Sequence, residues 1–439
     1  MKKLFLSSLG FSLCAFFINS VWGQANYLTP YAVTTMAGSP GHSGSADGTN
    51  GAASFAIDAV NLCGIAVDTN SGSIYVTDTG NSTIRRLTPV GTNWVVTTIA
   101  GQPGVTGSAN GTNTTATFNY PVGLTMDASG NLYVLDTLNY LVREISPMGT
   151  NWVTKTVAAF AGSPIEWAIT CDQNGNLYTV SSSGIQEISP TNNWQVVPIA
   201  GNVTFNALRG IAVDTNGNLY VVDALGPDVQ ELTLSGGNWV DKTIAGMPGV
   251  SGYADGTNTS AAFNQPESVA MDNQGNLYVT DSANQTIREI APVGPNWVVS
   301  TLAGISGGTG SADGVGINAG FNYPAGLVLD GHGNFYVGDT GNDTIRMGSV
   351  AKLPLAIARF GPNTNLVSWP SAASYLISGG VATATNWIGY PGAGHVLQSN
   401  GNLQTTNWAN YAGTVTTANG TNSAIITPVT GNLFFRLIQ

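Results

Sequence analysis

The chain has 439 residues, a formal net charge of −11 and only 8% charged residues. Thirteen lysine and arginine residues are too few for binding along a phosphate backbone, so we exclude nucleic acid as a partner. The length suits one large repeat domain with a second, smaller one.

Residues 1–24 have the pattern of a secretory signal peptide. A basic start is followed by an apolar run from Leu4 to Ile18 and by small residues near Gly23. The run is too short for a confident membrane span, and no other long apolar segment follows. We therefore expect a protein that is exported to the periplasm or the cell exterior, with no transmembrane span in the mature chain.

One segment recurs six times and predicts the fold. Its anchor is the tyrosine of an N-L-Y-V core, and successive anchors are separated by 58, 45, 42, 58 and 58 residues, at Tyr75, Tyr133, Tyr178, Tyr220, Tyr278 and Tyr336. A period of about 40 to 60 residues with strand-type patterning is typical of propeller blades. We expect an all-β fold, with a six-bladed β-propeller over residues 27–350.

The first strand-like segment of this region predicts how the ring closes. Residues 31–38, Y-A-V-T-T-M-A-G, match residues 94–101 and 297–304, which follow hairpin turns and read as fourth strands. The last repeat lacks such a strand. We therefore expect residues 31–38 to complete blade 6, which removes the open edges of the array.

Within a blade, an apolar G-I-A-V-D segment predicts the buried inner strand, and the D-x-x-G-N that follows predicts a hairpin turn. The second strand ends in aspartate in five copies. An asparagine comes three residues later in four of them, a spacing that suits side chains bonded to the turn that follows. We interpret these aspartates as turn caps.

The order G-(I/L)-A-V-D-x-x-G-N-L-Y-V-x-D-x-x-N-x-x-I-R resembles the NHL repeat. That family's fold is a six-bladed propeller closed by an N-terminal strand. The resemblance covers residues 31–349 and is specific in blades 1, 2, 5 and 6. Blades 3 and 4 depart from it, since Ser181 replaces the aspartate in blade 3 and Gln186 and Gln230 replace the arginine that opens the third strand.

Loop lengths divide the blades into two kinds. From the glycine that closes each fourth strand to the aspartate of the next hairpin, the separations are 30, 26, 10, 13, 26 and 26 residues. Phe118, Phe263 and Phe321 precede prolines in the long loops, and we expect them to fix the loops to their blades. The top face should then be a wall with one notch, above blades 3 and 4.

This notch holds the candidate binding residues. Trp167 and Arg209 come directly before the inner strands of blades 3 and 4, with Glu166 beside Trp167 and Glu267 before the inner strand of blade 5. An aromatic face beside a bidentate donor suits a protein, peptide or carbohydrate ligand. Alternatively, Arg209 and Glu267 form a structural ion pair that plugs the channel.

Catalytic and metal-binding candidates are few, and we assign no catalytic residue, no metal and no cofactor. The three histidines, His42, His332 and His395, fall in a linker, a turn and the C-terminal part, too far apart for a zinc site or a triad. The D-G-T-N loops offer oxygen ligands of the kind that calcium takes, but each has a single carboxylate. Cys63 and Cys171 lie in blades that should not touch, so we expect no disulfide.

The sequence thus favours a monomeric binding scaffold over an enzyme. The alternative is a metal-dependent propeller enzyme of lactonase-like or lyase-like type that would use Glu267 and Asp223. Residues 355–439 read as short strands and resemble small β modules at the C-termini of exported bacterial proteins. We expect a small β-sandwich-like domain there, and the resemblance implies attachment or carbohydrate binding.

Overall fold

The computed structural model describes residues 31–57, 63–162, 165–181, 184–199 and 205–351, and the backbone of strands between residues 356 and 438. Within them, no helix has the length and hydropathy needed to cross a membrane. The predicted leader, residues 1–24, lies outside the described residues.

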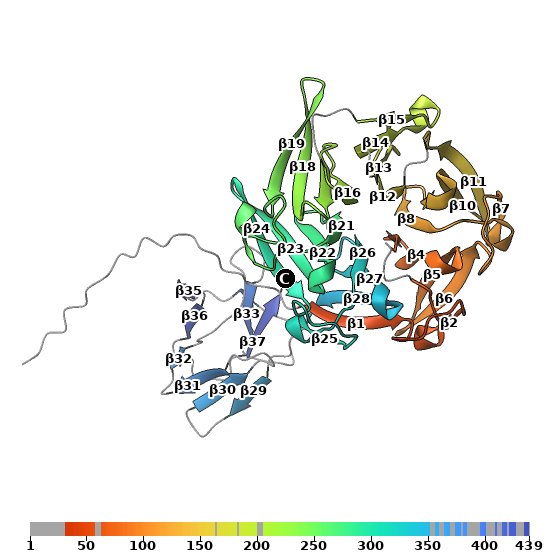
Figure 1. Cartoon of the computed structure of the whole chain (residues 1–439). Helices are drawn as coiled ribbons and strands as arrows, with labels where there is room; N and C mark the ends of the chain where they lie inside the picture. The colour runs from red at the N-terminus through yellow and green to blue at the C-terminus, as the bar shows by residue number, and fades with distance from the viewer. Residues whose placement is uncertain are drawn as a thin grey trace, which may run out of the picture.

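Six antiparallel sheets stand around a central axis, so the predicted all-β, six-bladed propeller is confirmed (Figure 1). The innermost strands are β3 (Ile65–Asp68), β8 (Pro121–Met126), β12 (Glu166–Cys171), β16 (Leu208–Val213), β21 (Pro266–Met271) and β26 (Pro324–Leu329). The second strands are β4 (Ser73–Asp78), β9 (Leu132–Asp136), β13 (Leu177–Ser181), β17 (Leu219–Asp223), β22 (Leu277–Asp281) and β27 (Phe335–Asp339). These pairs number blades 1 to 6 in chain order.

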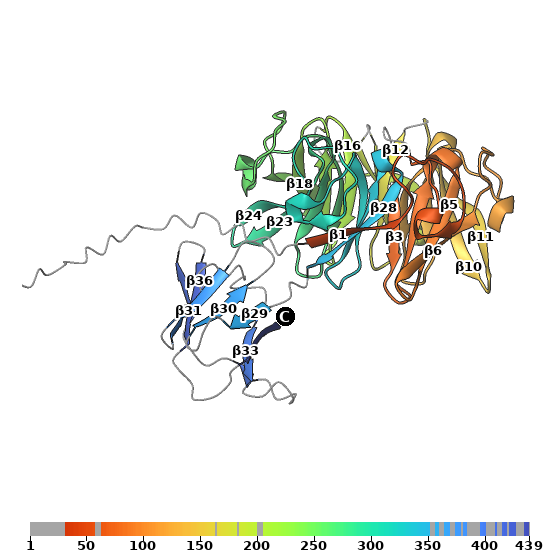
Figure 2. The same ribbon diagram turned by 90° about the horizontal axis from the view of Figure 1, so that it is seen from below.

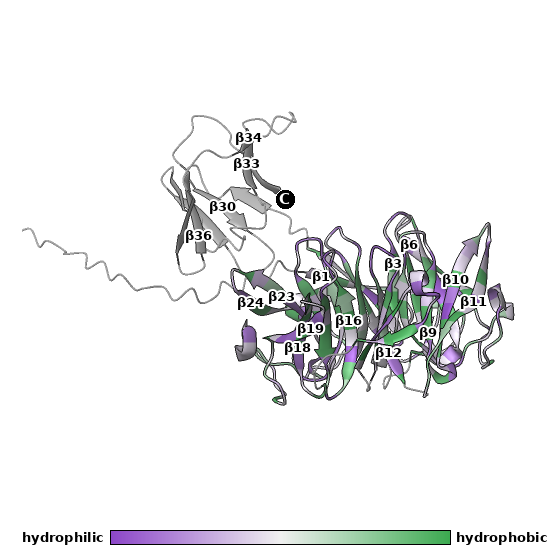
Figure 3. Cartoon of the chain, turned by 90° about the horizontal axis from the view of Figure 1, so that it is seen from above, coloured by the Kyte–Doolittle hydropathy of each residue, from purple (hydrophilic) through white to green (hydrophobic). Residues whose placement is uncertain are grey.

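Two further strands complete each blade. The third strands are β5 (Thr83–Val90), β10 (Leu141–Met148), β14 (Gly184–Ile188), β18 (Asp228–Ser235), β23 (Thr286–Val293) and β28 (Thr344–Val350). The fourth strands are β6 (Asn93–Ala100), β11 (Asn151–Ala159), β15 (Val196–Pro198), β19 (Asn238–Ala245), β24 (Asn296–Ala303) and, for blade 6, β1 (Tyr31–Ala37). Figure 2 shows the propeller turned by 90°, with the blades seen from the side. Apolar residues run along these strands inside the disc, while hydrophilic residues gather at its rims (Figure 3).

The N-terminal strand closes the ring as predicted. β1 pairs antiparallel with β28, with Tyr31 opposite Val350 and Thr35 opposite Arg346. Blade 6 therefore contains the first and the last strand of the propeller, and its sheet has the order β25-β1-β28-β27-β26.

The prediction that the four long loops form a wall on the top face was incomplete, because the loops also extend the sheets at their outer edges. Each runs over its blade and adds a two-residue fifth strand to the outer edge: β2 (Gly48–Thr49), β7 (Gly111–Thr112), β20 (Gly256–Thr257) and β25 (Gly314–Val315). A single turn of 3₁₀ helix follows each of them: η1 (Asn50–Ala52), η3 (Asn113–Thr115), η6 (Asn258–Ser260) and η8 (Gly316–Asn318). Blades 3 and 4 have four strands each.

A buried arginine holds each long loop in place. In blade 1, Arg85 donates to the Asp78 carboxylate at 2.5 Å and to Asp47 of the loop at 2.9 Å. It also donates to the backbone carbonyls of Ala46 and Ser54, and its guanidinium lies 5.1 Å from the ring centre of Phe55. Arg143, Arg288 and Arg346 repeat this arrangement, each 0% exposed.

In the four blades with a long loop, these contacts correct the interpretation of the second-strand aspartates as turn caps. In blade 4 the interpretation holds, because Asp223 accepts the turn amides of Leu225 and Gly226. Asp78 bonds Arg85 and the Ala56 amide of the loop, and it makes no side-chain cap to the 3₁₀ turn η2 (Thr79–Asn81). Asn81 donates to the carbonyl of Gly44 instead of to the following turn. The other turns of this kind are η4 (Thr137–Asn139), η7 (Ser282–Asn284) and η9 (Thr340–Asn342), while η5 (Pro190–Asn192) joins β14 to β15.

The same node explains the D-G-T-N motif. Asp47 is taken up by Arg85 and by both the amide and the hydroxyl of Thr98, which leaves its carboxylate engaged within the protein. Asn50 accepts the amide of Trp94 on the outer strand. The motif is therefore a clamp between loop and blade. Phe118, Phe263 and Phe321 are each 0% exposed, which confirms their role as loop anchors.

The C-terminal part is described by its backbone alone. One sheet has the order β29-β30-β31-β32-β36-β35 and a second the order β34-β33-β37. The strands are β29 (Ala356–Arg359), β30 (Thr364–Ser368), β31 (Ser374–Ser378), β32 (Val381–Thr383), β33 (Val396–Asn400), β34 (Ala409–Asn410), β35 (Val415–Ala418), β36 (Thr421–Ile426) and β37 (Phe434–Ile438). The prediction of a sandwich-like module depends on residues that lie largely outside the described ones.

Candidate functional site

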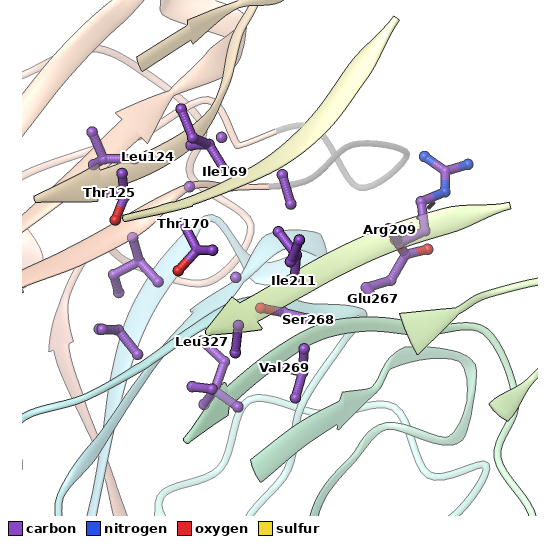
Figure 4. A pocket seen from close by; sticks show the side chains of 18 of the residues that line it. Leu124, Thr125, Ile169, Thr170, Arg209, Ile211, Glu267, Ser268, Val269 and Leu327 are labelled. Atoms are coloured by element: carbon purple, nitrogen blue, oxygen red, sulfur yellow. Dashed lines mark ion pairs between the residues drawn. The ribbon is translucent and has the colours of Figure 1, made fainter. Parts of the chain in front are cut away.

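The channel along the propeller axis contains a cavity of about 230 Å³ that is lined by the inner strands of all six blades (Figure 4). One turn of the channel is an aliphatic ring, with one side chain from each blade: Ile65, Leu124, Ile169, Ile211, Val269 and Leu327. Each of these is 4 to 6% exposed, so the ring forms an apolar belt within the channel. The charged residues of the lining, Arg209 and Glu267, lie at the end where the inner strands begin, while Thr125 and Thr170 add hydroxyl groups beyond the ring.

Trp167, Arg209 and Glu267 meet at this end, which we call the mouth. They come from β12, β16 and β21, three neighbouring blades. Each is an extra residue in its strand: the pairing skips from Glu166 to Ala168, from Leu208 to Gly210 and from Pro266 to Ser268. A β-bulge of this kind re-aims one side chain out of the regular alternation, and here it turns three of them towards the mouth.

Arg209 lies over the ring of Trp167. Its guanidinium carbon is 4.0 Å from the centre of the indole ring, close enough for a cation–π contact. Its Nε lies 3.9 Å from Oε2 of Glu267, too far for a hydrogen bond. The two side chains are 25% and 20% exposed, so the pair faces solvent only in part (Figure 4).

Close packing of two strands brings these groups together. A side chain at Gly210 would lie 2.8 Å from Cα of Ser268 and 2.9 Å from the carbonyl of Glu267. Glycine is therefore needed for β21 to approach β16 this closely, and the approach sets the separation of Arg209 and Glu267.

Burial raises the pKa of the Glu267 carboxyl to about 7, and Arg209 lowers it only in part. An isolated charge in a poorly solvated position is costly, so the neutral acid persists to a higher pH than it does in water. Oε2 of Glu267 and Nε of Arg209 have no hydrogen-bond partner within the described part of the chain.

The opposite side of the mouth is apolar. Val122 and Ala325 are buried there, with Tyr120 and Trp167 packed against them, and Cys63 completes the lining from blade 1. The sequence analysis did not identify Tyr120. The signal that could have found it is the Asn-Tyr-Pro triplet, which occurs where the inner strands of blades 2 and 6 begin. Cys63 and Cys171 are both free thiols, so the two are not bonded to each other.

Glu166 does not join the other three predicted residues. It pairs with Ser181 in the sheet, is 1% exposed and is not among the residues that line the channel. Burial raises the pKa of its carboxyl to about 7, and the neighbouring hydroxyls of Thr179 and Ser181 counteract this in part. Neither carboxylate oxygen has a hydrogen-bond partner of good geometry among the described residues.

The residues suggested for a metal-dependent enzyme do not converge. Asp223 accepts four backbone amides, from Asn206, Ala207, Leu225 and Gly226, and does not line the channel. Glu267 is the single carboxylate on the channel wall among the described residues. In the same part of the chain, no three histidine, cysteine, aspartate or glutamate side chains form a group that could hold a metal ion.

Comparison with known proteins agrees with the repeat and the fold. The NHL repeat model matches residues 64–87 and 263–290, which span the first three strands of blades 1 and 5. The chain therefore carries NHL repeats within a six-bladed propeller. Both matches fall on blades with a long loop and a buried arginine, and the divergent blades 3 and 4 supply two of the three mouth residues of this NHL propeller.

A curated relative is the protein SUPPRESSOR OF QUENCHING 1, chloroplastic, of Arabidopsis thaliana. It is 28% identical over 324 residues, which cover 64% of this chain and 30% of the relative. The NHL propeller chain thus aligns with less than a third of that protein's length.

Two solved structures from Bacteroides thetaiotaomicron share the fold. A protein of unknown function has a TM-score of 0.60 at 20% identity, and an auxiliary nutrient binding protein has a TM-score of 0.57 at 15% identity. In both cases the match covers 73% of this chain and 76% of the other. At these identities the likeness shows a shared propeller architecture.

Proposed function

We propose that this NHL-repeat propeller is an exported binding protein that holds a ligand or peptide at the mouth of its channel. The observation that carries the proposal is the stacked Arg209 and Trp167, placed beside Glu267 at a cavity. Repeated blades provide a rigid ring, and binding residues that differ from the repeat are positioned on it by bulges.

The geometry favours binding over a structural plug. A plug should be satisfied internally, yet the 3.9 Å separation of Arg209 and Glu267 leaves both without a mutual hydrogen bond. Both side chains also keep a fifth to a quarter of their surface exposed. Removing either should therefore affect ligand binding more than folding.

An array of peptides and glycans probed with the chain from residue 25 onwards tests the proposal. We expect ligands that bind the wild type and are lost when Trp167→Ala and Arg209→Ala are combined. Leu234→Ala is the matched control, because Leu234 is exposed near the hairpin between β18 and β19, away from the mouth residues. Equal binding by the double variant, at an unchanged melting temperature, would rule the mouth out.

Export is part of the proposal and has its own test. With residues 1–24 present, we expect the protein in the periplasm or the medium of a bacterial host and an N-terminus that begins near residue 25. Without them it should stay in the cytoplasm. Retention of the full-length chain in the cytoplasm would contradict the export proposal.

A further inference from the structure

Arg209 differs from the four arginines that hold the loops. Arg85, Arg143, Arg288 and Arg346 each donate to an aspartate and to two backbone carbonyls. Arg209 makes no hydrogen bond within the described part of the chain; its contacts are the indole of Trp167 and the more distant Glu267. A guanidinium carries five donors in a planar fork, so this one is held in place with its donors unused.

The cavity is too small for a whole large ligand. Its volume of about 230 Å³ lies below the range of roughly 300 to 1,000 Å³ that is typical of pockets for drug-sized molecules. The lining continues past the aliphatic ring to Thr125 and Thr170, so this volume is that of the whole channel cavity. The cavity therefore suits a small molecule or the end of a chain, with a polar group beside Arg209 and an apolar part against the aliphatic ring.

We propose that the mouth binds the carboxylate of a small acid or of a peptide C-terminus, with the Arg209 fork as its donor and Trp167 holding that fork in place. The inference rests on the proposed function and names its ligand class. Planar carboxylates match the guanidinium fork through two parallel hydrogen bonds. A monoanion also balances one guanidinium, whereas a doubly charged phosphate would exceed the positive charge available.

Glu267 makes the site sensitive to pH. Among the described elements packed against β21, β16 contributes Arg209 and β26 contributes the apolar Ala325. The carboxylates of Asp223 on β17 and Asp281 on β22 are taken up by backbone amides and by Arg288. With a pKa raised to about 7, Glu267 is neutral in mild acid and can donate to the bound carboxylate. Above that pH it is charged and repels it.

Calorimetry with two matched pairs of probes tests the inference. Benzoate against benzamide represents small acids, and N-acetylphenylalanine against its amide represents a peptide C-terminus. We expect the acids to bind and the amides to bind at least about tenfold more weakly, the size of effect that a charged hydrogen bond gives. The pair with the larger preference identifies the source of the carboxylate.

Variants separate the roles of the two charged residues. Arg209→Lys keeps the charge without the fork and should weaken acid binding about tenfold. In the wild type, acid binding should weaken as the pH rises from about 6 to about 8, and Glu267→Gln should make it independent of pH over this range. Arg86→Gln, which removes an arginine stacked on Tyr75 outside the mouth, should change nothing.

The outcomes distinguish this inference from the proposed function. If acids and amides bind alike, or neither binds, while array ligands still require Trp167 and Arg209, the carboxylate assignment is wrong and the binding mouth stands. If no array ligand depends on Trp167 and Arg209, both the proposed function and the carboxylate assignment are wrong. Acid binding that survives Arg209→Lys undiminished would also overturn the assignment of the fork.

Discussion

The hydroxyl oxygens of Tyr31 and Tyr278 lie 3.4 Å apart across the boundary between blades 5 and 6. At other boundaries between blades, a tryptophan on the outer strand of one blade packs against the second-strand tyrosine of the preceding blade. Examples are Trp152 with Tyr75 and Trp297 with Tyr220. Tyr31 thus takes the place of that tryptophan in the closing strand, and it also stacks on Phe335 at 5.1 Å.

Replacing Tyr31 should weaken the closure of the ring. The side chain is 4% exposed, so Tyr31→Ala leaves a cavity and should lower the free energy of unfolding by about 3 to 5 kcal/mol. Tyr31→Phe removes only the hydroxyl and should cost about 1 kcal/mol. Urea denaturation measures both, with Leu234→Ala at an exposed position as the control. A cost for Tyr31→Ala no larger than that of the control would contradict the closure contact.

Breaking one arginine node should cost more than removing a surface charge. Asp281→Asn leaves the guanidinium of the fully buried Arg288 without its 2.6 Å carboxylate partner, and we expect a loss of about 3 to 5 kcal/mol. Asp241→Asn on the exposed β19 is the control and should stay within about 0.5 kcal/mol. In the double variant Asp281→Asn with Arg288→Met, part of the loss should be recovered because the buried guanidinium that lost its partner is no longer there, and Asp255, its other partner, is partly exposed. Strict additivity of the two substitutions would argue against the node.

Glu166 should make the stability depend on pH. Its pKa is raised from 4.5 to about 7 in the folded state, so the folded protein keeps this proton longer than the unfolded chain does. Stability is therefore lost as the pH rises from about 4.5 to about 7 and stays lost above. Glu166→Gln should remove this loss, which amounts to roughly 3 kcal/mol at pH 8. Denaturation curves at a series of pH values measure the difference, and parallel pH profiles of variant and wild type would refute it.

The outer edges of blades 3 and 4 should be protected by their sequence. The other four blades cover the outer strand with a fifth strand, whereas β15 ends in Pro198 and β19 carries Asp241 and Lys242 where β6 has Val96 and Thr97. Proline and charged residues discourage pairing at open strand edges.

Exchanging Asp241→Val together with Lys242→Thr should expose an edge that pairs with other copies of the chain. We expect association that increases with concentration in light scattering, at unchanged net charge. Lys155→Thr on β11, whose edge is already covered by β7, is the control and should remain monomeric. A double variant as monodisperse as the wild type would show that these charges do not guard the edge.

Periodicity was sufficient to predict the ring. The six tyrosine anchors, spaced as in propeller blades, predicted the number of blades. The outer-strand segment that precedes the first repeat predicted the pairing of Tyr31 with the last repeat. The number of blades and the closure of the ring depend on the pattern of apolar residues and on the residues of the hairpin turns. Both patterns can be read directly from the sequence. The length of each loop likewise separated blades 3 and 4 from the rest.

Features that depend on long-range contacts were not predictable in this way. Arg85 was interpreted only as the start of a strand, because its partners Asp47 and Ala46 lie 38 and 39 residues away and nothing local announces them. The β-bulges determine which side chains reach the site. The regular alternation of side chains along a strand does not predict that Trp167 and Arg209 are extra residues, nor that Glu166 turns away from the mouth. Bulge positions follow from how neighbouring strands pair in three dimensions.

Blade 6 is assembled from the two ends of the propeller sequence, and this has a consequence for synthesis. Tyr31 leaves the ribosome first, but its partner strand is complete only when Val350 has been added. Blades 1 to 5 can form from contiguous segments during translation, whereas the seal must wait for a contact spanning more than three hundred residues, a slow kind of step in folding. Until then the nascent propeller is an open arc, and the edges of the strands at its two ends are unpaired.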